Sequence, residues 1–509
     1  MATIAIAAPH PAAVEAARQV TAAGGGLIDA ALAAAAALTV AYPHQCSIGG
    51  DLVALFRDGA QGTVRSVLSA GAAAAATDPA PLRAAGDRMP AGGPLTVTVP
   101  GVVAGWAELA RLGARLPLAR SLAPAIALAD GGVPVSEGLA RAIRNRLGVV
   151  RADAGLSALL LDTAGAPLPV GATLTQPALA ATLRELSDDW RHFYTGPTAR
   201  RLVAGLRERG SLLDATDFAG HRAQNTAPLS ATANGVTWWV APPPSQGASL
   251  LAVLARRADR ATDPPADPLT AARQAELSRD ALLGDPRTGT VDIDGLLLRA
   301  ERDVAALPSG PRPAGDTVAV TAVDDEGNAV TLIQSVFQSF GSGIADPATG
   351  IVLHNRGSAF SLDPAHPGAL RPGARPPHTL CPALATAPGR VVALGCQGGR
   401  AQAWILSQVA EDLLDAPDPE AVLARPRWVI GSRDLNRPYP TLVLEPGTPD
   451  AGHLTVVAHR LGMEVAGTAG PHDEAGHVQT ARLRGDEVDA ATDPRADGTT
   501  AVLTGSALR

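Results

Sequence analysis

Apolar residues recur at helical spacing along much of the first half of the chain. Residues 12–25 (AAVEAARQVTAAGG) have one apolar face and end at glycines, which predicts an amphipathic helix. Residues 27–42 (LIDAALAAAAALTVAY) are apolar on nearly every side and predict an interior helix. Two further helices are predicted at 117–132 and 175–194, and two short strands at 52–58 and 95–101.

The pattern changes at Thr317. Residues 317–323 (TVAVTAV) and 329–336 (AVTLIQSV) are rich in β-branched residues, and the turn-forming sequence DDEGN separates them, which predicts a β-hairpin. If the turn is centred on Glu326, residues equally distant from it face each other, and Thr317 and Ser335 are such a pair. The pattern by itself also fits an ordinary cross-strand contact between a threonine and a serine.

The remaining segments predict a mixed fold. Residues 256–268 are polar and proline-rich and predict a surface connection, while glycine and proline dominate an exposed, flexible segment at 305–316. The first half is mainly helical and the second half opens with strands. This favours a single α+β fold in which helices and sheets from both halves are combined. The further elements predicted after the hairpin are strands at 350–355, 390–396, 454–459 and 501–505, and a helix at 402–415.

Composition narrows the class of protein. The 509 residues are 46% hydrophobic and 18% charged, as in folded globular proteins, and the formal net charge of −7 argues against a nucleic acid partner. The three cysteines show neither metal-ligand spacing nor a disulfide pattern. The N-terminal residues do not resemble a secretory signal, and the alanine-rich run at 29–39 is too short to cross a membrane. We therefore expect a cytoplasmic protein with no membrane partner.

The junction between Asp316 and Thr317 suggests that the chain is cut there and that Thr317 then acts as a nucleophile. A strand that opens directly after an exposed segment is arranged for the chain to be cut there. A cut would turn the Thr317 nitrogen into an α-amino group with a pKa of about 7.7–8.0, which is partly neutral at physiological pH. That amine can accept the proton of the hydroxyl on the same residue, so no Ser-His-Asp triad is needed. Thr317 is therefore a candidate nucleophile.

Several sequence blocks follow one another in order along the chain. The second half contains DTVAVTAVDDEGNAV, FGSGI, GIVLHNRGSAFS, RPPHTLCPAL, GCQGGRAQ and DPRADG. The first half contains residues 24–50, TVPGVVAGW, LPLARSLAPAIALADGGVPV and APPPSQGAS. In this order the blocks resemble the γ-glutamyltransferase family of N-terminal-nucleophile (Ntn) hydrolases over nearly the whole chain. NRGSAFSLD and RPPHTL resemble a divergent subgroup with oxamate amidohydrolase-like members.

This resemblance implies a four-layer αββα sandwich built jointly by a large subunit (residues 1–316) and a small subunit (317–509). It implies that Thr317 is the nucleophile, that Ser335 hydrogen-bonds it, and that backbone N–H groups of Gly398 and Gly399 form the oxyanion hole. The precursor would cut itself between Asp316 and Thr317. The mature enzyme would be a heterodimer of the two subunits, and two such heterodimers could form a dimer. It would need no cofactor and no metal.

The residues expected to select a γ-glutamyl group are altered. Phe337 stands where the family has an asparagine, and Arg356 and Ala359 stand where a glutamine and an aspartate hold the substrate amine. Losing that aspartate removes the partner of an ammonium group, and gaining Arg356 favours an anionic group instead. The residues that we expect to contact the substrate are Asn355, Arg356, His378, Thr379 and Phe337.

The sequence thus predicts a self-processing hydrolase or acyltransferase that cleaves an amide-type acyl bond through an acyl-Thr317 intermediate. The substrate is expected to be a small acyl or amide compound with an anionic group, and not glutathione. Two alternatives stay open. One is a member of a secondary-metabolite pathway that hydrolyses an unusual acyl bond or a C–C bond, and the other is an uncut relative kept as a binding or structural protein.

Overall fold

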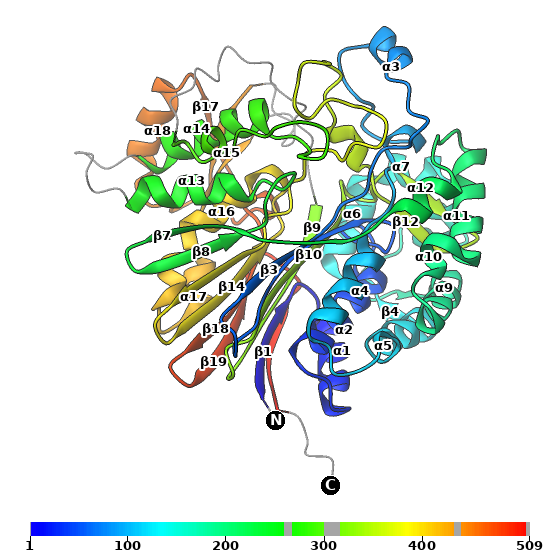
Figure 1. Cartoon of the computed structure of the whole chain (residues 1–509), viewed down its shortest axis with the longest axis horizontal. Coiled ribbons are helices and arrows are strands. Elements are labelled where there is room, and N and C mark those ends of the chain that lie inside the picture. The colour runs from blue at the N-terminus through cyan, green and yellow to red at the C-terminus, as the bar shows by residue number, and fades with distance from the viewer. Residues whose placement is uncertain (1, 259–266, 300–315, 432–438, 505–509) are drawn as a thin grey trace.

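Two β-sheets stack face to face at the centre of the molecule, and helices cover the outer face of each sheet (Figure 1). The computed structural model describes residues 2–258, 267–299, 316–431 and 439–504. The predicted flexible segment at 305–316, except Asp316 itself, and part of the predicted connection at 256–268 lie outside the described residues. The architecture is the αββα sandwich of the α+β class that the sequence predicts.

The first sheet combines strands from both halves of the chain. The central hairpin β9–β10 pairs on one side with β1 and on the other with β2, and both of these strands come from the first 60 residues. The two halves are therefore joined by backbone hydrogen bonds. In sheet order the strands are β20 (Thr499–Thr504), β1 (Thr3–Ala8), β9 (Asp316–Asp324), β10 (Ala329–Phe337), β2 (Asp51–Arg57), β3 (Val64–Ser69) and β6 (Gln224–Thr226).

The second sheet is also shared between the two halves, since β8 from the first half pairs with β13 from the second. Leu384 and Ala393 of this sheet pack against Leu55 and Val323 of the first sheet, which closes the interior between the sheets. In sheet order the strands are β19 (Glu487–Thr492), β18 (Val478–Arg484), β14 (Arg390–Cys396), β13 (Ala383–Ala387), β8 (Val236–Val240) and β7 (Leu229–Ala233).

Two helical layers complete the sandwich. The buried helix α2 (Leu27–Ala41) is mostly alanine, so it packs closely against the apolar face of the first sheet. The other helices on this side include α1 (Pro11–Ala22), α4 (Val102–Gly113), α5 (Leu118–Gly131), α9 (Pro177–Asp188), α10 (His192–Thr195) and α11 (Pro197–Glu208). The helices over the second sheet include α13 (Gly247–Ala258), α14 (Pro268–Leu282), α16 (Gln402–Val409), α17 (Pro419–Ala424) and α18 (Ala451–Arg460).

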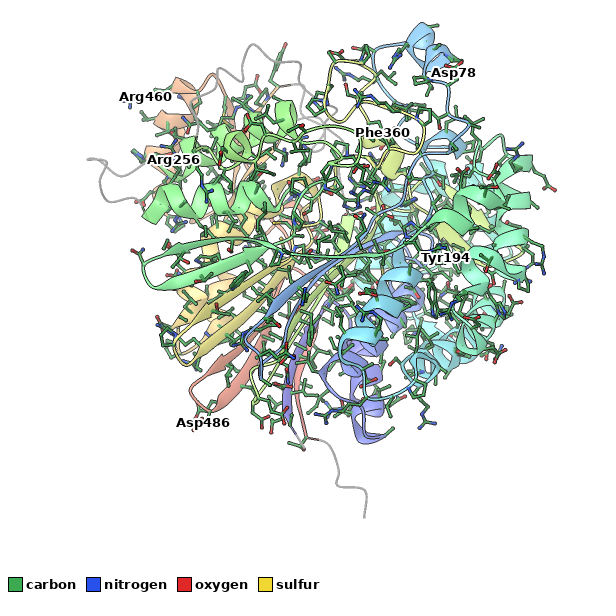
Figure 2. All side chains as sticks on the ribbon, in the orientation of Figure 1. Asp78, Tyr194, Arg256, Phe360, Arg460 and Asp486 are labelled. Carbon is green, nitrogen blue, oxygen red and sulfur yellow. The ribbon has the colours of Figure 1, made fainter. Side chains whose placement is uncertain are left out.

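Short elements surround this frame, and Figure 2 shows the side chains on all of the layers. The short helices are α3 (Ala80–Ala85), α6 (Glu137–Asn145), α7 (Leu147–Ala152), α8 (Ala154–Leu160), α12 (Ala215–Gly220), α15 (Ile293–Leu296) and the 3₁₀ helices η1 (Pro94–Thr96), η3 (Arg356–Ala359), η4 (Gly399–Ala401), η5 (Asp412–Leu414) and η7 (Asp473–Ala475). Two small sheets pair β4 (Val133–Pro134) with β5 (Thr173–Leu174) and β11 (Ile344–Asp346) with β12 (Ile351–Leu353). A third has the order β15 (Trp428–Gly431), β16 (Thr441–Leu444) and β17 (Glu464–Gly467).

Two predicted strands are wrong. Residues 454–459 (LTVVAH) belong to helix α18, because Leu454, Val457 and Ala458 are buried at helical spacing while Val456 is 49% exposed. Residues 95–101 form no strand, since they begin in the 3₁₀ helix η1 and continue as a buried, extended connection. In both segments β-branched residues suggested a strand that the surrounding packing overrides.

None of the described helices is long and apolar enough to cross a membrane.

Candidate active site

The hairpin β9–β10 has the predicted register along most of its length. Val323 pairs with Ala329 and Val318 pairs with Gln334, as expected for a turn centred on Glu326. The register then shifts by one residue, so that Asp316 pairs with Phe337. Thr317 and Ser335 therefore lie at a β-bulge, a feature that redirects side chains at the end of a ladder.

Thr317 and Ser335 face the space between the two sheets. Ala319 and Ile333, two residues along each strand, pack in one cluster with Leu380 from the segment before β13. Because side chains alternate along a strand, Thr317 and Ser335 lie on that same face. Both are almost fully buried in the continuous chain.

The hydroxyl of Ser335 connects the nucleophile candidate to the bond before it. Thr317 Oγ1 donates to Ser335 Oγ at 3.3 Å, and the backbone N–H of Phe337 donates to the same oxygen at 2.7 Å. Ser335 Oγ in turn donates to the carbonyl oxygen of Asp316. One serine hydroxyl therefore touches both the Thr317 hydroxyl and the carbonyl of the Asp316–Thr317 peptide bond.

The side chain of Asp316 lies in a polar recess. Gln397 Nε2 donates to Asp316 Oδ1 at 3.1 Å, and Ser339 Oγ donates to Oδ2. Burial raises the pKa of the Asp316 carboxyl, and these two hydrogen bonds offset part of the shift. Gln397 directly precedes Gly398, so its contact brings the glycine pair close to the Asp316–Thr317 bond.

Gly398 and Gly399 form the tight connection between β14 and helix α16. Their φ angles are 144° and 51°, in the region that disfavours other residues. A Cβ on Gly398 would also lie 2.5 Å from Ile405 Cδ1. The backbone geometry of this loop therefore requires glycine, as expected for a loop whose N–H groups approach a substrate closely.

A buried guanidinium lies beside these groups. Arg356 Nη1 donates to Pro377 O at 3.2 Å, Nη2 donates to Thr379 Oγ1 at 3.0 Å, and the guanidinium carbon lies 3.4 Å from the centre of the Phe337 ring. Burial lowers the pKa of Arg356 to about 9, although the charge of Asp51 opposes this shift. Among the residues that the structure describes, no carboxylate forms an ion pair with Arg356.

His378 lies in a buried cluster around Asp51. Asp51 Oδ2 lies 3.2 Å from His378 Nε2 and 3.4 Å from His354 Nδ1, while Oδ1 accepts the backbone N–H of Gly71 at 3.0 Å. His354 Nε2 lies 2.9 Å from Thr98 O. Asp51 therefore joins the first half of the chain to two segments of the second half that line the site.

Burial and neighbouring charges shift the pKa values of Asp51 and His378. Burial by itself raises the pKa of Asp51, but the neighbouring His354 and His378 bring it well below the ordinary value. Burial and the nearby charge of Arg356 lower the pKa of His378 to about 4. At neutral pH we therefore expect an ionised Asp51 beside an uncharged His378.

Gln246 connects the substrate-side segment to the glycine loop. Its Nε2 donates to the carbonyl oxygens of Thr379 and Gly399, the latter at 2.9 Å. Its Oε1 accepts from Arg279 Nη1 at 2.6 Å, and the same nitrogen donates to Arg400 O at 2.7 Å. A side chain from the first half of the chain thus supports the carbonyl side of the Gly398–Gly399 loop.

The predicted site residues Thr317, Ser335, Phe337, Arg356 and Thr379 are thus connected by direct contacts. Asn355 is adjacent but uses its side chain on the scaffold, since Oδ1 accepts from Gln338 N and Nδ2 donates to Ala91 O. The sequence patterns did not single out Asp51, Gln246, Arg279, Ser339 or Gln397. The available signal was a set of polar residues inside or beside otherwise apolar or glycine-rich blocks.

Comparison with known proteins gives the same family as the ordered sequence blocks. Residues 13–503 match the family described as Gamma-glutamyltranspeptidase. The chain belongs to the gamma-glutamyltranspeptidase family. It is 38% identical to an oxamate amidohydrolase proenzyme from Klebsiella pneumoniae, over 97% of both chains. It is 31% identical to a glutathione hydrolase-like YwrD proenzyme from Bacillus subtilis, again over 97% of both chains.

The fold agrees with a crystal structure of cephalosporin acylase from Bacillus halodurans. The TM-score is 0.86 at 29% identity, over 99% of this chain and 96% of that chain. The relatives and the solved structure that resemble this chain are thus named as hydrolases and as an acylase. The chain is an Ntn-type hydrolase of this family, and the alternative of a non-enzymatic binding protein falls away.

Proposed function

We propose that this chain is a self-cleaving N-terminal-threonine hydrolase that cleaves the amide of a small, negatively charged acyl compound. Residues 1–316 would form the large subunit and residues 317–509 the small subunit. The proposal is supported by the contact of Ser335 with both sides of the Asp316–Thr317 junction. It is also supported by relatives named as proenzymes.

In the proposed reaction the free α-amine of Thr317 accepts the proton of the Thr317 hydroxyl. The hydroxyl oxygen attacks the substrate carbonyl carbon, and the backbone N–H groups of Gly398 and Gly399 stabilise the oxyanion. The C–N bond of the amide then breaks, and the amine leaves with the proton. Water attacks the acyl-Thr317 ester, which releases the acid and restores the hydroxyl.

The observation that carries the proposed substrate class is the buried guanidinium of Arg356, which forms no ion pair with a carboxylate of the residues that the structure describes. Buried charges in proteins are normally paired, because an isolated charge loses its hydration. A substrate carboxylate would supply the missing partner, next to Phe337 and two residues from Ser335 in sequence. Oxamate, for which one relative is named, carries a carboxylate directly beside its amide.

A comparison of two nearly isosteric amides tests this substrate class. Oxamate and the uncharged oxamide present the same kind of amide bond, but only oxamate has a carboxylate for Arg356. We expect the processed enzyme to release ammonia from oxamate with a kcat/KM at least about tenfold above that for oxamide. γ-Glutamyl-p-nitroanilide serves as the family comparison. Faster turnover of that compound or of oxamide than of oxamate would contradict the proposal.

After cleavage the two subunits would stay associated as a heterodimer. Strands β1 and β2 precede the junction and pair directly with β9 and β10, which follow it. Separating the subunits would break these ladders and expose the core between the sheets, so we infer that the cut chains stay together.

The replacement Gln246→Glu tests the support of the glycine loop. It keeps an acceptor for Arg279 but replaces the donor that faces Thr379 O and Gly399 O by a carboxylate oxygen. We expect kcat on oxamate to fall about tenfold, because an unsatisfied buried hydrogen bond shifts the loop from its productive geometry. Steady-state kinetics of the processed enzyme would measure this change.

Gln408 offers a matched control. Its Nε2 donates to Trp404 O and Trp428 O, and its Oε1 accepts from Trp428 N, so it uses both ends of its amide as Gln246 does, but none of these hydrogen bonds reaches the Gly398–Gly399 loop or Thr379. Gln408→Glu should lower the melting temperature without a specific loss of kcat. Equal kinetic effects of the two replacements would show that Gln246 has a merely structural role.

A further inference from the structure

The side chain of Asp316 forms hydrogen bonds that the pairing of strand β9 does not need. Its two carboxyl oxygens accept hydrogen bonds from two different parts of the fold. Ser339 follows β10 of the first sheet, and Gln397 follows β14 of the second. Asp316 therefore links the ends of two strands from opposite sheets.

The hydrogen bonds of Ser339 and Gln397 hold the residue before the cut, which is not the residue that would catalyse turnover. In the proposed mature enzyme Thr317 is the first residue of the small subunit, and Asp316 is the last residue of the large subunit. The Asp316 side chain is consequently not part of the nucleophile, the base or the oxyanion hole. A role in chemistry for this residue is confined to the single event that cuts the chain.

The same contacts restrain the peptide bond that must be cut. On the acyl side, the Asp316 carbonyl accepts from Ser335 Oγ and the side chain is held at both oxygens. On the nitrogen side, Thr317 is followed by Val318, which pairs with Gln334 in the hairpin ladder. With both sides held, the carbonyl carbon stays near the Thr317 hydroxyl, as an intramolecular attack requires.

We propose that Ser339 and Gln397 are positioning residues for self-cleavage, which they promote by holding the Asp316 side chain, and that this contact does not serve turnover. This inference rests on the proposed function. In the cleavage step a bond forms between Thr317 Oγ and the Asp316 carbonyl carbon, and the C–N bond breaks. The hydroxyl proton passes to the Thr317 nitrogen, which becomes an amine. Water then breaks the ester, leaving a carboxylate on Asp316 and the free hydroxyl on Thr317.

The test follows conversion of freshly purified precursor into two chains on denaturing gels. Ser339→Ala removes one hydrogen bond to the Asp316 carboxyl and should slow conversion about tenfold, and Asp316→Ala removes both and should slow it further. Because both remove the same contact, the double variant should be no slower than Asp316→Ala. Asp316→Asn keeps an acceptor for Gln397 and a polar group for Ser339, so it should convert close to the wild-type rate.

The second readout separates cleavage from turnover. Once fully converted, Asp316→Ala should have the kcat and KM of the wild-type enzyme on oxamate. Ser342→Ala is the matched control, since Ser342 lies three residues after Ser339 but donates to Leu353 O at 2.8 Å. It should convert at the wild-type rate.

Contrary results would separate a failure of the positioning role from a failure of self-cleavage. Conversion of Asp316→Ala at the wild-type rate, multiplicative effects in the double variant, or altered kcat in the converted Asp316→Ala enzyme would overturn this inference. A wild-type chain that never converts yet is active would overturn the proposed self-cleavage itself.

Discussion

Replacing Thr317 by alanine is expected to leave one uncut chain without amidase activity. The wild-type protein should give two polypeptides of about 32 and about 20 kDa from the 51.5 kDa chain, since the Thr317 hydroxyl is the proposed nucleophile of both cleavage and turnover. Denaturing gels and intact mass spectrometry would detect the cut, and ammonia release from oxamate would measure the activity. Among the predicted effects on activity this one should be the largest.

Two variants make the result specific. Thr317→Ser keeps a hydroxyl and an α-amine after cleavage, so it should still be cut and retain part of the activity. Thr321→Ala changes a buried threonine of the same strand, four residues further along, and should behave like the wild-type protein. Full activity of an uncut Thr317→Ala chain would refute the threonine mechanism.

Replacing Arg356 by glutamine is expected to lower kcat/KM for oxamate by about 100-fold. The loss of a charge-assisted contact with the substrate carboxylate corresponds to about 3 kcal/mol. The kcat/KM for oxamide should change little, because that substrate offers no charge to the guanidinium. Parallel kinetics on the two amides would show the preference for the anionic substrate disappear.

Arg482 provides the control for loss of a buried arginine. It is fully buried and paired with Asp489, in contrast to the guanidinium of Arg356. Arg482→Gln should lower the melting temperature, since it removes the ion pair with Asp489 and the hydrogen bonds to Leu413 O and Ala416 O, but it should preserve the ratio of oxamate to oxamide turnover. If Arg356→Gln lowers turnover of both amides equally, Arg356 does not bind the anionic group.

The local parts of the fold were predictable from the sequence. Helix α2 is a long and almost entirely apolar run, the strands of hairpin β9–β10 are rich in β-branched residues, and turn residues at 324–328 define the register between Val318 and Gln334. The strand predicted at 454–459 failed because β-branched residues also fit a helix when one face packs on the core. Short segments without a decisive period need their neighbours to settle their structure.

The site was only partly predictable. The hairpin register and the family resemblance predict from the sequence that Thr317 and Ser335 face each other, and in the structure the two hydroxyls are in contact. The bulge that shifts Phe337 opposite Asp316 gave no signal in the pattern. Neither did the contact of Asp51 with His378 or that of Gln246 with Gly399, each of which joins residues more than a hundred positions apart along the chain.

By itself the sequence determined the family and the order of the main elements, and it predicted a cleavage junction between Asp316 and Thr317, because these depend on local patterns and on ordered blocks. The tertiary structure decided which polar groups surround that junction. Ser339 and Gln397 around Asp316, and Arg356 without a carboxylate partner among the described residues, result from strands and loops brought together across both sheets. Such long-range contacts follow from packing, which leaves no periodic trace in the sequence.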